Sequence, residues 1–477
     1  MSNNGSFGFV NPANSSTEKA IAIYRNLDKD FVLSPADMGS TVRIEAPNTY
    51  RVRLPDARQL VADLMVIITN ASTTTAFDII DNNGGIIKTV LPLQTAIVWN
   101  TSKTTSSGVW TATIMGKGSM TNISLGAEQN IYSTSVAANR IKVCGISDTR
   151  AVLFYVTGST MMAVLLTIAG SAITAGTPIT VQASANVAND VELLLSSSTG
   201  NSYVLFAYQY PTGAAIRYSE LKITSAGVLS VSVSANSGLY ADTTKVGIAA
   251  IDDTHVMVVG YVGNVAYTRL LTIVHDTSIT ESAAYLFTTS NAGTYNCMDV
   301  SVDNSQVIYV YCATGGNTYA CVGNTTTRAT SELLLTAGLA SDGGALAKIT
   351  TGKALFIAQN GTASILTVTG TGASATIAET SVTSLGISQS TSLYESGLSS
   401  IDGNTFVFTY LNASGYPCQT LILVNGSTIT VKSTTVMVSS SAGYAHGSVL
   451  PGVNRTAIGI YRRTSDSTIY GDIATNY

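Results

Sequence analysis

Aspartates recur at one position of a sequence repeat in this 477-residue chain, and their carboxylates are groups that could take part in acid–base catalysis. Asp148, Asp253, Asp303 and Asp402 occupy the same place in successive sequence repeats. A glycosidase would need two such carboxylates facing each other across a cleft. Repetition is more typical of turns, because an aspartate side chain accepts hydrogen bonds from the backbone that follows it. We therefore predict no catalytic residue and a protein that is not an enzyme, with glycan hydrolysis kept as the lesser alternative.

Histidine and cysteine are too scattered to form a recognisable metal site. His255, His275 and His446 lie far apart in the sequence, and no zinc-type spacing connects them. The cysteines are odd in number, lack a Cys-x-x-Cys pair and are predicted to be buried free thiols: Cys144, Cys297, Cys312, Cys321 and Cys418. We expect neither a metal nor a cofactor.

Four tyrosines are expected in the loops that connect strands, namely Tyr210, Tyr218, Tyr240 and Tyr416. A tyrosine ring is planar and amphipathic, which suits contact with the face of a sugar. These residues are therefore the candidate contacts for a receptor or a carbohydrate. The other interpretation is that they are partly buried surface positions, and the sequence leaves both open.

A repeat of about 51 residues determines which elements must position these side chains. The gap between Tyr311 and Tyr410 is about two periods wide, and Ala354–Ala358 fills it with an apolar run in the same phase that lacks the tyrosine. In the other units a tyrosine ends a short apolar run: Tyr155, Tyr208, Tyr261, Tyr311, Tyr410 and Tyr461. The pattern therefore predicts an all-β chain with seven repeated units.

Each unit contains short apolar runs separated by Gly, Asn, Asp and Ser, which indicates four strands. Four strands in roughly 40–50 residues are typical of a propeller blade. The last unit is one strand short, and Gly118–Ile123 has the pattern of the missing strand. We predict that this N-terminal strand completes the last blade and closes a seven-bladed β-propeller over residues 117–477.

Composition restricts the partners. Charged residues make up only 11% of the chain, and the net charge is −4, so the Lys/Arg clusters that bind nucleic acid are not expected. The uncharged stretch Ala151–Asn189 contains turn residues in register with the repeats, which indicates strands and no membrane segment. The first residues lack the basic stretch and apolar core of a signal peptide.

Two regions precede the repeats. Residues 1–24 lack periodicity and are predicted to form an extended or docking arm. Residues 25–116 are predicted to form a small β domain, because apolar and polar residues alternate in Thr41–Glu45. Both tryptophans, Trp99 and Trp110, are predicted to be core residues of this domain.

The small domain resembles a β module found in many structural proteins of tailed bacteriophages. The resemblance rests on Leu33–Gly39, on a strand ending in Leu54–Pro55, on the hairpin at Asn82–Gly85 and on Gly108–Trp110. The repeats are similar to the blades of propellers in phage tail and head appendages. The resemblance implies a non-enzymatic virion protein, tail- or capsid-attached, but no triple-helical or coiled-coil shaft is visible.

The same resemblance implies where the parts of the chain would act. Residues 1–116 would dock on other virion proteins, and the propeller would face outward, where it could meet a host glycan or receptor. The protein would be assembled in the host cytoplasm as a symmetric homo-oligomer or in multiple copies.

Sialidase-type propellers are the enzymatic alternative. They resemble repeats of Ser-x-Asp-x-Gly-x-Thr-Trp with an arginine cluster that binds the substrate carboxylate. The predicted propeller contains no tryptophan, and Ser341–Gly344 is the nearest string. The sequence therefore disfavours this class.

Overall fold

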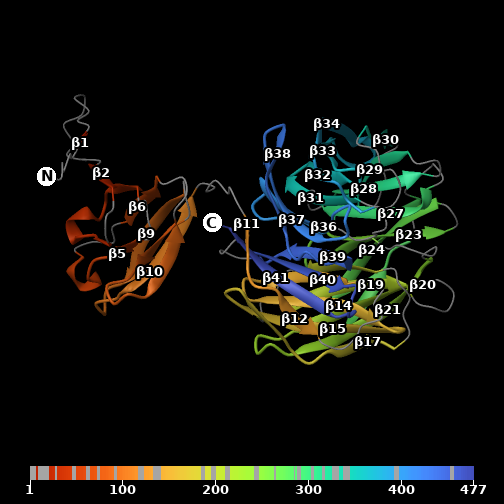
Figure 1. Ribbon diagram of the computed structural model, residues 1–477, viewed down its shortest axis with the longest axis horizontal. Helices are drawn as coiled ribbons and strands as arrows, with labels where there is room; N and C mark the ends of the chain where they lie inside the picture. Colours follow the sequence, from red (N-terminus) through yellow and green to blue (C-terminus); the bar gives the residue numbers. More distant parts are fainter. Residues whose placement is uncertain are drawn as a thin grey trace. The chain divides into compact units, whose positions relative to one another are not determined.

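The computed structural model is all-β: among the described residues, the only helical segments are three 3-10 turns of three residues each. The chain divides into two compact units, Met1–Thr121 with Tyr477, and Asn122–Asn476 (Figure 1). The expected boundary between residues 116 and 117 lies outside the described residues. The structure describes residues 7–8, 21–26, 30–45, 50–60, 65–71, 76–90, 94–115, 123–132, 141–183, 189–194, 200–209, 215–240, 247–262, 265–283, 285–286, 292–301, 306–313, 317–324, 332–336, 344–390, 397–451 and 456–476.

The first unit contains two sheets, with strand orders β1-β2-β4-β6-β9-β10 and β3-β5-β7-β8. From β2 to β7 the chain alternates between the sheets, so β2, β4 and β6 are parallel neighbours, as are β3, β5 and β7. The pairs β7–β8, β6–β9 and β9–β10 are antiparallel. The strands are β1 (Phe7–Gly8), β2 (Ile21–Asn26), β3 (Phe31–Val32), β4 (Thr41–Glu45), β5 (Arg51–Arg53), β6 (Met65–Asn70), β7 (Phe77–Ile80), β8 (Ile86–Val90), β9 (Thr95–Ser102) and β10 (Val109–Met115).

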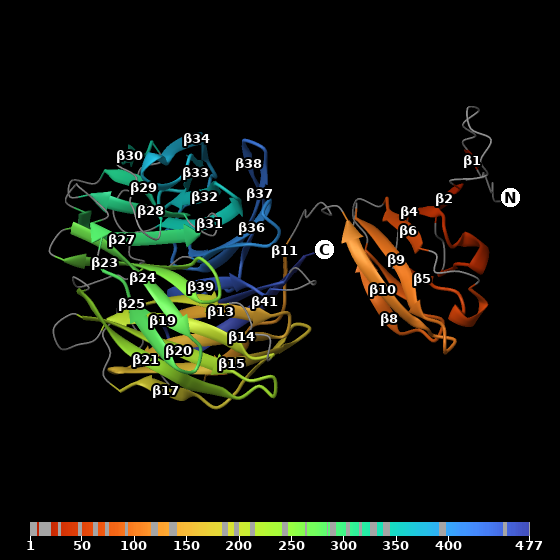
Figure 2. The same cartoon turned by 180° about the vertical axis from the view of Figure 1, so that it is seen from behind.

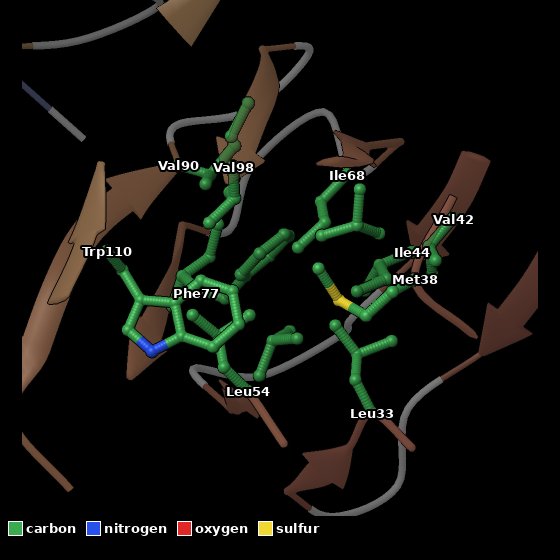
Figure 3. Packing of buried hydrophobic residues seen from close by; sticks show 14 of the residues in the cluster. Leu33, Met38, Val42, Ile44, Leu54, Ile68, Phe77, Val90, Val98 and Trp110 are labelled. Atoms are coloured by element: carbon green, nitrogen blue, oxygen red, sulfur yellow. The ribbon is translucent and has the colours of Figure 1, made fainter. Parts of the chain in front are cut away.

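The core of the first unit lies between these sheets and follows the alternation seen in the sequence. Val42 and Ile44 of β4 are buried, whereas Thr41 and Arg43 are exposed. Figure 3 shows the buried cluster, with the Trp110 indole at one side and the Leu33 and Met38 side chains opposite. One face of each sheet therefore packs into a shared apolar core.

The first unit contains two 3-10 turns and both tryptophans of the chain. The 3-10 turn η1 (Pro35–Asp37) begins after Ser34, whose backbone N–H and hydroxyl both donate to Asp37 Oδ2 at 2.7 Å. A second 3-10 turn, η2, spans Ala57–Gln59. Trp110 is a core residue, and its Nε1–H donates to a backbone carbonyl at 2.6 Å. The core prediction for Trp99 is wrong: this ring is only partly buried, because it lies on the opposite face of β9 from buried Val98.

The second unit is built from small antiparallel sheets (Figures 1 and 2). A third 3-10 turn, η3, spans Gly372–Ser374. The strands are β11 (Ile123–Leu125), β12 (Gln129–Tyr132), β13 (Ile141–Ser147), β14 (Arg150–Thr157), β15 (Thr160–Ala169), β16 (Ala172–Ala175), β17 (Ile179–Gln182), β18 (Asn189–Leu194), β19 (Ser202–Gln209), β20 (Ala215–Ile223), β21 (Leu229–Tyr240), β22 (Gly247–Ala250), β23 (His255–Val262), β24 (Val265–Val274), β25 (Ser278–Glu281), β26 (Tyr285–Leu286), β27 (Ala292–Ser301), β28 (Gln306–Ala313), β29 (Thr318–Asn324), β30 (Leu333–Leu334), β31 (Gly344–Thr350), β32 (Lys353–Ala358), β33 (Thr362–Thr369), β34 (Thr376–Ser384), β35 (Gly397–Ser400), β36 (Thr405–Leu411), β37 (Pro417–Asn425), β38 (Thr428–Val436), β39 (Ala442–Val449), β40 (Ala457–Arg463) and β41 (Ile469–Asn476).

Consecutive strands pair as meanders, such as β27-β28-β29-β30, β31-β32-β33-β34 and β35-β36-β37-β38. The first strands of the meanders contact one another in the order β13, β18, β22, β27, β31, β35 and β39, and β39 contacts β13 again. The unit is therefore propeller-like. One departure is that β21 is long enough for Tyr240 to pair with Tyr261 of β23, which joins two meanders into one nine-stranded sheet.

A segment at the start of this unit pairs with its last strand, as the sequence predicts, although only Ile123 of the predicted strand Gly118–Ile123 is among the described residues. Ile123, Ser124 and Leu125 of β11 pair antiparallel with β41, and β12 pairs with the earlier part of β41. Figure 1 shows β11 beside β41. We call residues 123–132 the ribbon, β13–β17 the opening sheet, and β39–β41 the closing sheet. The ribbon completes the closing sheet and removes an exposed sheet edge.

The tyrosines at the ends of the second strands are packing residues. Tyr155, Tyr208, Tyr311 and Tyr461 are at most 3% exposed, and Ala358 occupies the corresponding buried position in β32. The tyrosine-free strand predicted at Ala354–Ala358 is thus confirmed as β32.

Candidate functional site

Two aspartates at the recurrent position bond to the turns that follow them. Asp402 Oδ1 accepts the backbone N–H groups two and three positions later, at 3.0 and 2.8 Å. Asp252 Oδ1 accepts the equivalent pair at 2.8 and 2.7 Å. The register predicted from the sequence is therefore corrected by one residue, from Asp253 to Asp252. Asp148 is half-buried in the turn between β13 and β14, and Asp303 lies outside the described residues.

The three histidines do not meet. His255 Nδ1 lies 2.9 Å from the carboxylate of its own turn, and His275 Nδ1 lies 2.6 Å from Glu220 Oε1. His446 Nδ1 accepts the backbone N–H of Val143 at 3.3 Å. Within the described part of the chain, no three His, Cys, Asp or Glu residues form a group that could hold a metal ion.

Three cysteines match their prediction as free, buried thiols: Cys144, Cys321 and Cys418. Burial raises the pKa of the Cys418 thiol to about 11, so this thiol stays protonated and unreactive at neutral pH. The side chains of Cys297 and Cys312 are not described. Across the residues with assigned structure, no helix has the length and apolar character needed to cross a membrane.

The four candidate tyrosines have different surroundings. Tyr218 is 0% exposed in β20, and its hydroxyl donates to Glu281 at 2.8 Å, so the prediction of a loop-presented ring is wrong there. The reason is that β20 continues through Tyr218, which the sequence placed in a connection. Tyr240 ends β21 and its side chain is not described, and Tyr210 lies outside the described residues. Tyr416 is half-buried in the turn between β36 and β37.

The partly exposed polar cluster at the closing sheet is the strongest candidate site. Glu128 of the ribbon accepts hydrogen bonds from the Tyr461 hydroxyl and from the Arg463 guanidinium. Arg463 lies over the Tyr470 ring, 3.9 Å from its centroid. The Tyr470 hydroxyl donates to Asp466 Oδ2 at 2.9 Å. We call these five residues the Glu128 cluster.

The Glu128 cluster offers charged and aromatic groups to a ligand. The Arg463 and Glu128 side chains are 22% and 28% exposed, so a ligand could reach the guanidinium and the carboxylate. Burial and the Glu128 carboxylate raise the pKa of Tyr461, which keeps its hydroxyl a donor. An aromatic face next to charged hydrogen-bonding groups matches the hydroxyl and C–H surfaces of a sugar.

The turn that carries Tyr416 adjoins the same region. The Ala442 backbone N–H donates to the carbonyl of Gly415 at 2.9 Å, and the Thr464 N–H donates to the carbonyl of Ser441 at 2.9 Å. The Tyr416 turn and the turn after Arg463 are thus both bonded to the start of β39. Of the two candidate tyrosines whose side chains are described, the structure brings the partly exposed one, Tyr416, near a cluster that sequence reasoning missed.

A buried carboxylate lies beside the cluster. Asp472 of β41 is 1% exposed, and burial together with the nearby Glu128 charge raises its pKa to about 7. Among the described residues its Oδ1 has no hydrogen-bond partner. At neutral pH the Asp472 carboxyl is therefore near its titration midpoint.

A second cluster joins β19 and β20 to the turn after β24. Glu220 is fully buried and accepts from the Asp276 backbone N–H at 3.1 Å as well as binding His275. Asp276 binds Lys222 Nζ at 2.5 Å and the Tyr203 hydroxyl at 2.9 Å, and the hydrogen bond from Lys222 lowers the Asp276 pKa to about 2. Tyr203 stacks on the His275 ring with centroids 4.0 Å apart.

This second cluster has the pairing of an oriented base, with the outer imidazole nitrogen buried. A carboxylate bound to one imidazole nitrogen orients the other nitrogen for proton transfer. His275 Nε2 is buried and has no partner among the described residues. The cluster serves to join two neighbouring meanders. Its sequence signal is a pair of charged residues, Glu220 and Lys222, which are two positions apart and therefore lie on one face of β20.

Comparison with known proteins gives distant structural similarity alone. No protein-family model and no curated protein sequence matches the chain. The BP39L lectin of Burkholderia pseudomallei is similar with a TM-score of 0.49 and 11% identity, covering 75% of this chain and 97% of that one. The NanB sialidase of Streptococcus pneumoniae has a TM-score of 0.38 and 10% identity, covering 85% of each chain. The Aleuria aurantia lectin has a TM-score of 0.39 and 9% identity, covering 65% of this chain and 98% of that one. Similarities this weak carry no argument about ligand or activity.

Proposed function

We propose that this chain is a non-enzymatic structural component of a phage particle. Residues 1–116 dock on other virion proteins, and a seven-bladed propeller is displayed outward. The observation that carries the proposal is the division into a ring closed by its own ribbon and a separate small unit. In the Glu128 cluster the carboxylates bond to the tyrosine hydroxyls and the guanidinium of the same cluster, which favours a structural role over catalysis.

The contacts of the inner strands support the blade count. Each of the strands β13, β18, β22, β27, β31, β35 and β39 contacts the next, and each begins a meander of the same order. Repeated blades around one axis bury both faces of each sheet at about 25 cal/mol per Å² of apolar area. A closed ring also leaves few sheet edges, which suits a protein exposed outside the cell.

The surface of the small unit supports docking. Met65 is 52% exposed on β6, and Val109 is 56% exposed on β10 of the same sheet. Exposed apolar side chains that share one sheet are where we place the docking surface, because an apolar patch can mark a protein interface. A full-length chain carrying Met65→Glu and Val109→Glu should enter virions several-fold less efficiently. Val382→Glu, at a 43% exposed position on β34, is the matched control and should incorporate normally. Equal incorporation of the two variants would contradict the docking assignment.

A second candidate function is carbohydrate or receptor binding at the closing sheet. The specific observation is the stacking of Arg463 on Tyr470 beside the Tyr416 turn. Tyr416→Ala should reduce glycan or host-cell binding at least tenfold, whereas Tyr319→Ala, at a half-buried tyrosine of β29, should not. Absence of binding on a glycan array, with normal host adsorption of the Tyr416 variant, would discard this candidate.

A further inference from the structure

The opening and closing sheets are joined at the inside of the ring by two side chains of β39. His446 Nδ1 accepts the Val143 backbone N–H at 3.3 Å, and Ser448 Oγ accepts the Gly145 backbone N–H at 3.0 Å. A Cβ atom on Gly145 would lie 2.1 Å from the Val449 carbonyl oxygen. The glycine at position 145 therefore allows β13 and β39 to lie close together. The hydrogen bonds to His446 and Ser448 stabilise this contact.

The bond at His446 depends on the protonation state of the ring. An imidazole nitrogen accepts a hydrogen bond only when it carries no proton. Burial, and to a smaller extent the positive charge of Lys142, lowers the pKa of His446 well below its usual value. Lys142 of β13 is the cation that acts on His446, and Arg462 of β40 lies opposite Tyr444, two residues along β39 from His446. The described parts of β13, β35, β36, β37, β39 and β40 contain no Asp or Glu.

The outer side of the same joint is held without histidine. Gln129 of the ribbon accepts the Ile173 N–H at 2.7 Å and donates to the Ser171 carbonyl. Its neighbour Glu128 binds Tyr461 and Arg463 of the closing sheet. The ribbon thus bridges both sheets, so loss of the inner bonds would loosen the joint while the ribbon keeps the sheets together.

We propose that the contact between β13 and β39 is an acid-sensitive seam, at which the ring loosens before any other sheet boundary. A proton from solvent binds His446 Nδ1, the Val143 N–H loses its acceptor, and a third cation is added beside Lys142 and Arg462. The seam closes again when the proton leaves. This inference concerns the ring itself and does not depend on a role in a virion.

Linkage sets the sign and size of the effect. Because the His446 pKa is lower in the closed seam than in the open one, closure is complete above about pH 6.5 and weakens below it. Each pH unit below that point reduces the ratio of closed to open seam by up to about tenfold. Between about pH 6.5 and 4.5 the expected loss is therefore up to about 100-fold.

Amide hydrogen exchange of the full chain tests the seam directly. The protection factors of Val143 and Gly145 should fall up to about 100-fold on acidification, while those of central strands such as β32 should not change. His446→Asn keeps an acceptor oxygen but does not titrate, so its protection factors should be independent of pH. His255→Asn, at a histidine in a turn of β23, is the matched control and should behave like the unmodified chain.

Lys142→Gln provides a second variant that leaves His446 in place. Removing this cation should move the loss of protection to higher pH. The proposal is overturned if His446→Asn shows the same acid loss as the unmodified chain, if Lys142→Gln leaves the midpoint unchanged, or if all sheets lose protection together.

Discussion

Replacing Asp472 with asparagine should stabilise the second unit, and the gain should grow with pH. Asp472 lies opposite Gly459 in the β40–β41 pair, so both residues point to the same face of the closing sheet. A Cβ on Gly459 would lie 2.5 Å from Gln419 Nε2, so that face packs against Gln419. Gln419 Oε1 is buried and, like Asp472 Oδ1, has no partner among the described residues. An amide at position 472 can donate a hydrogen bond that the ionised carboxylate cannot.

The magnitude follows from the displaced pKa of Asp472. The folded value is about 7, against an ordinary value of 3.8, and the side chain is 1% exposed. Because the folded pKa is raised, the contribution to stability is complete below the unfolded pKa and is lost as the pH rises through 7. At about 1.4 kcal/mol per pKa unit, the ionised carboxylate costs the fold about 4 kcal/mol in alkaline solution. The advantage of Asp472→Asn should grow by about 3 kcal/mol between about pH 4.5 and 8.5.

Chemical and thermal unfolding of the full chain at both pH values measures this difference. For a unit of this size, about 4 kcal/mol corresponds to a rise of about 5 °C in Tm above pH 8. Comparing variant and unmodified chain at each pH cancels the titration of other groups, including His446. A gain that is equal at both pH values, or a loss at high pH, would refute the assignment of a buried, unpartnered carboxylate.

Three further changes test the packing of the second unit. His275→Ala should destabilise it by about 3 kcal/mol, because fully buried Glu220 loses its imidazole partner and keeps only the Asp276 N–H. A double-mutant cycle with Glu220→Gln should show strong coupling in denaturant titrations. Gly447→Ala should cost about 1–3 kcal/mol of unfolding free energy, because its Cβ would lie 2.0 Å from Thr409 Oγ1. As a control, Gly426→Ala places a Cβ with no atom within 4 Å and should cost about 1 kcal/mol. Similar losses for both variants would argue against the close approach at Gly447. Glu128→Gln should reduce the protection of the ribbon amides in hydrogen exchange, and unchanged protection would mean that the ribbon is held by its strand pairing alone.

The strands and their order could be predicted because the repeat carries local information. Short apolar runs ending in residues such as Tyr155 and Tyr461 mark strands, and the turns between them contain Gly, Asn and Asp. The pairing of the ribbon with β41 could be predicted because one repeat lacked a strand and another segment had its pattern. Periodicity is sufficient for both inferences.

Side-chain environments could not be predicted in the same way. Tyr218 was expected in a loop, yet an extended β20 buries it against Glu281. Glu128, Arg463 and Asp472 meet only after the ring closes, and no local pattern reports an encounter across more than three hundred residues. The one-residue correction from Asp253 to Asp252 has the same origin, because only hydrogen-bond geometry tells which of two adjacent aspartates faces the turn.

The pairing of β11 with β41 has a consequence for the order in which the chain acquires structure. Synthesis makes the ribbon well before its partner strand, so β11 and β12 must wait, unpaired, until nearly all intervening sheets have been translated. Contacts of such long sequence separation form slowly, since the loop-closure entropy is lost before the pairing is gained. A chain released before β41 is made would form an open ring with two unpaired sheet edges, which could pair with other chains. The rate of elongation, or a chaperone that holds the unfinished chain, should therefore affect the yield of folded protein most while β40 and β41 are being made.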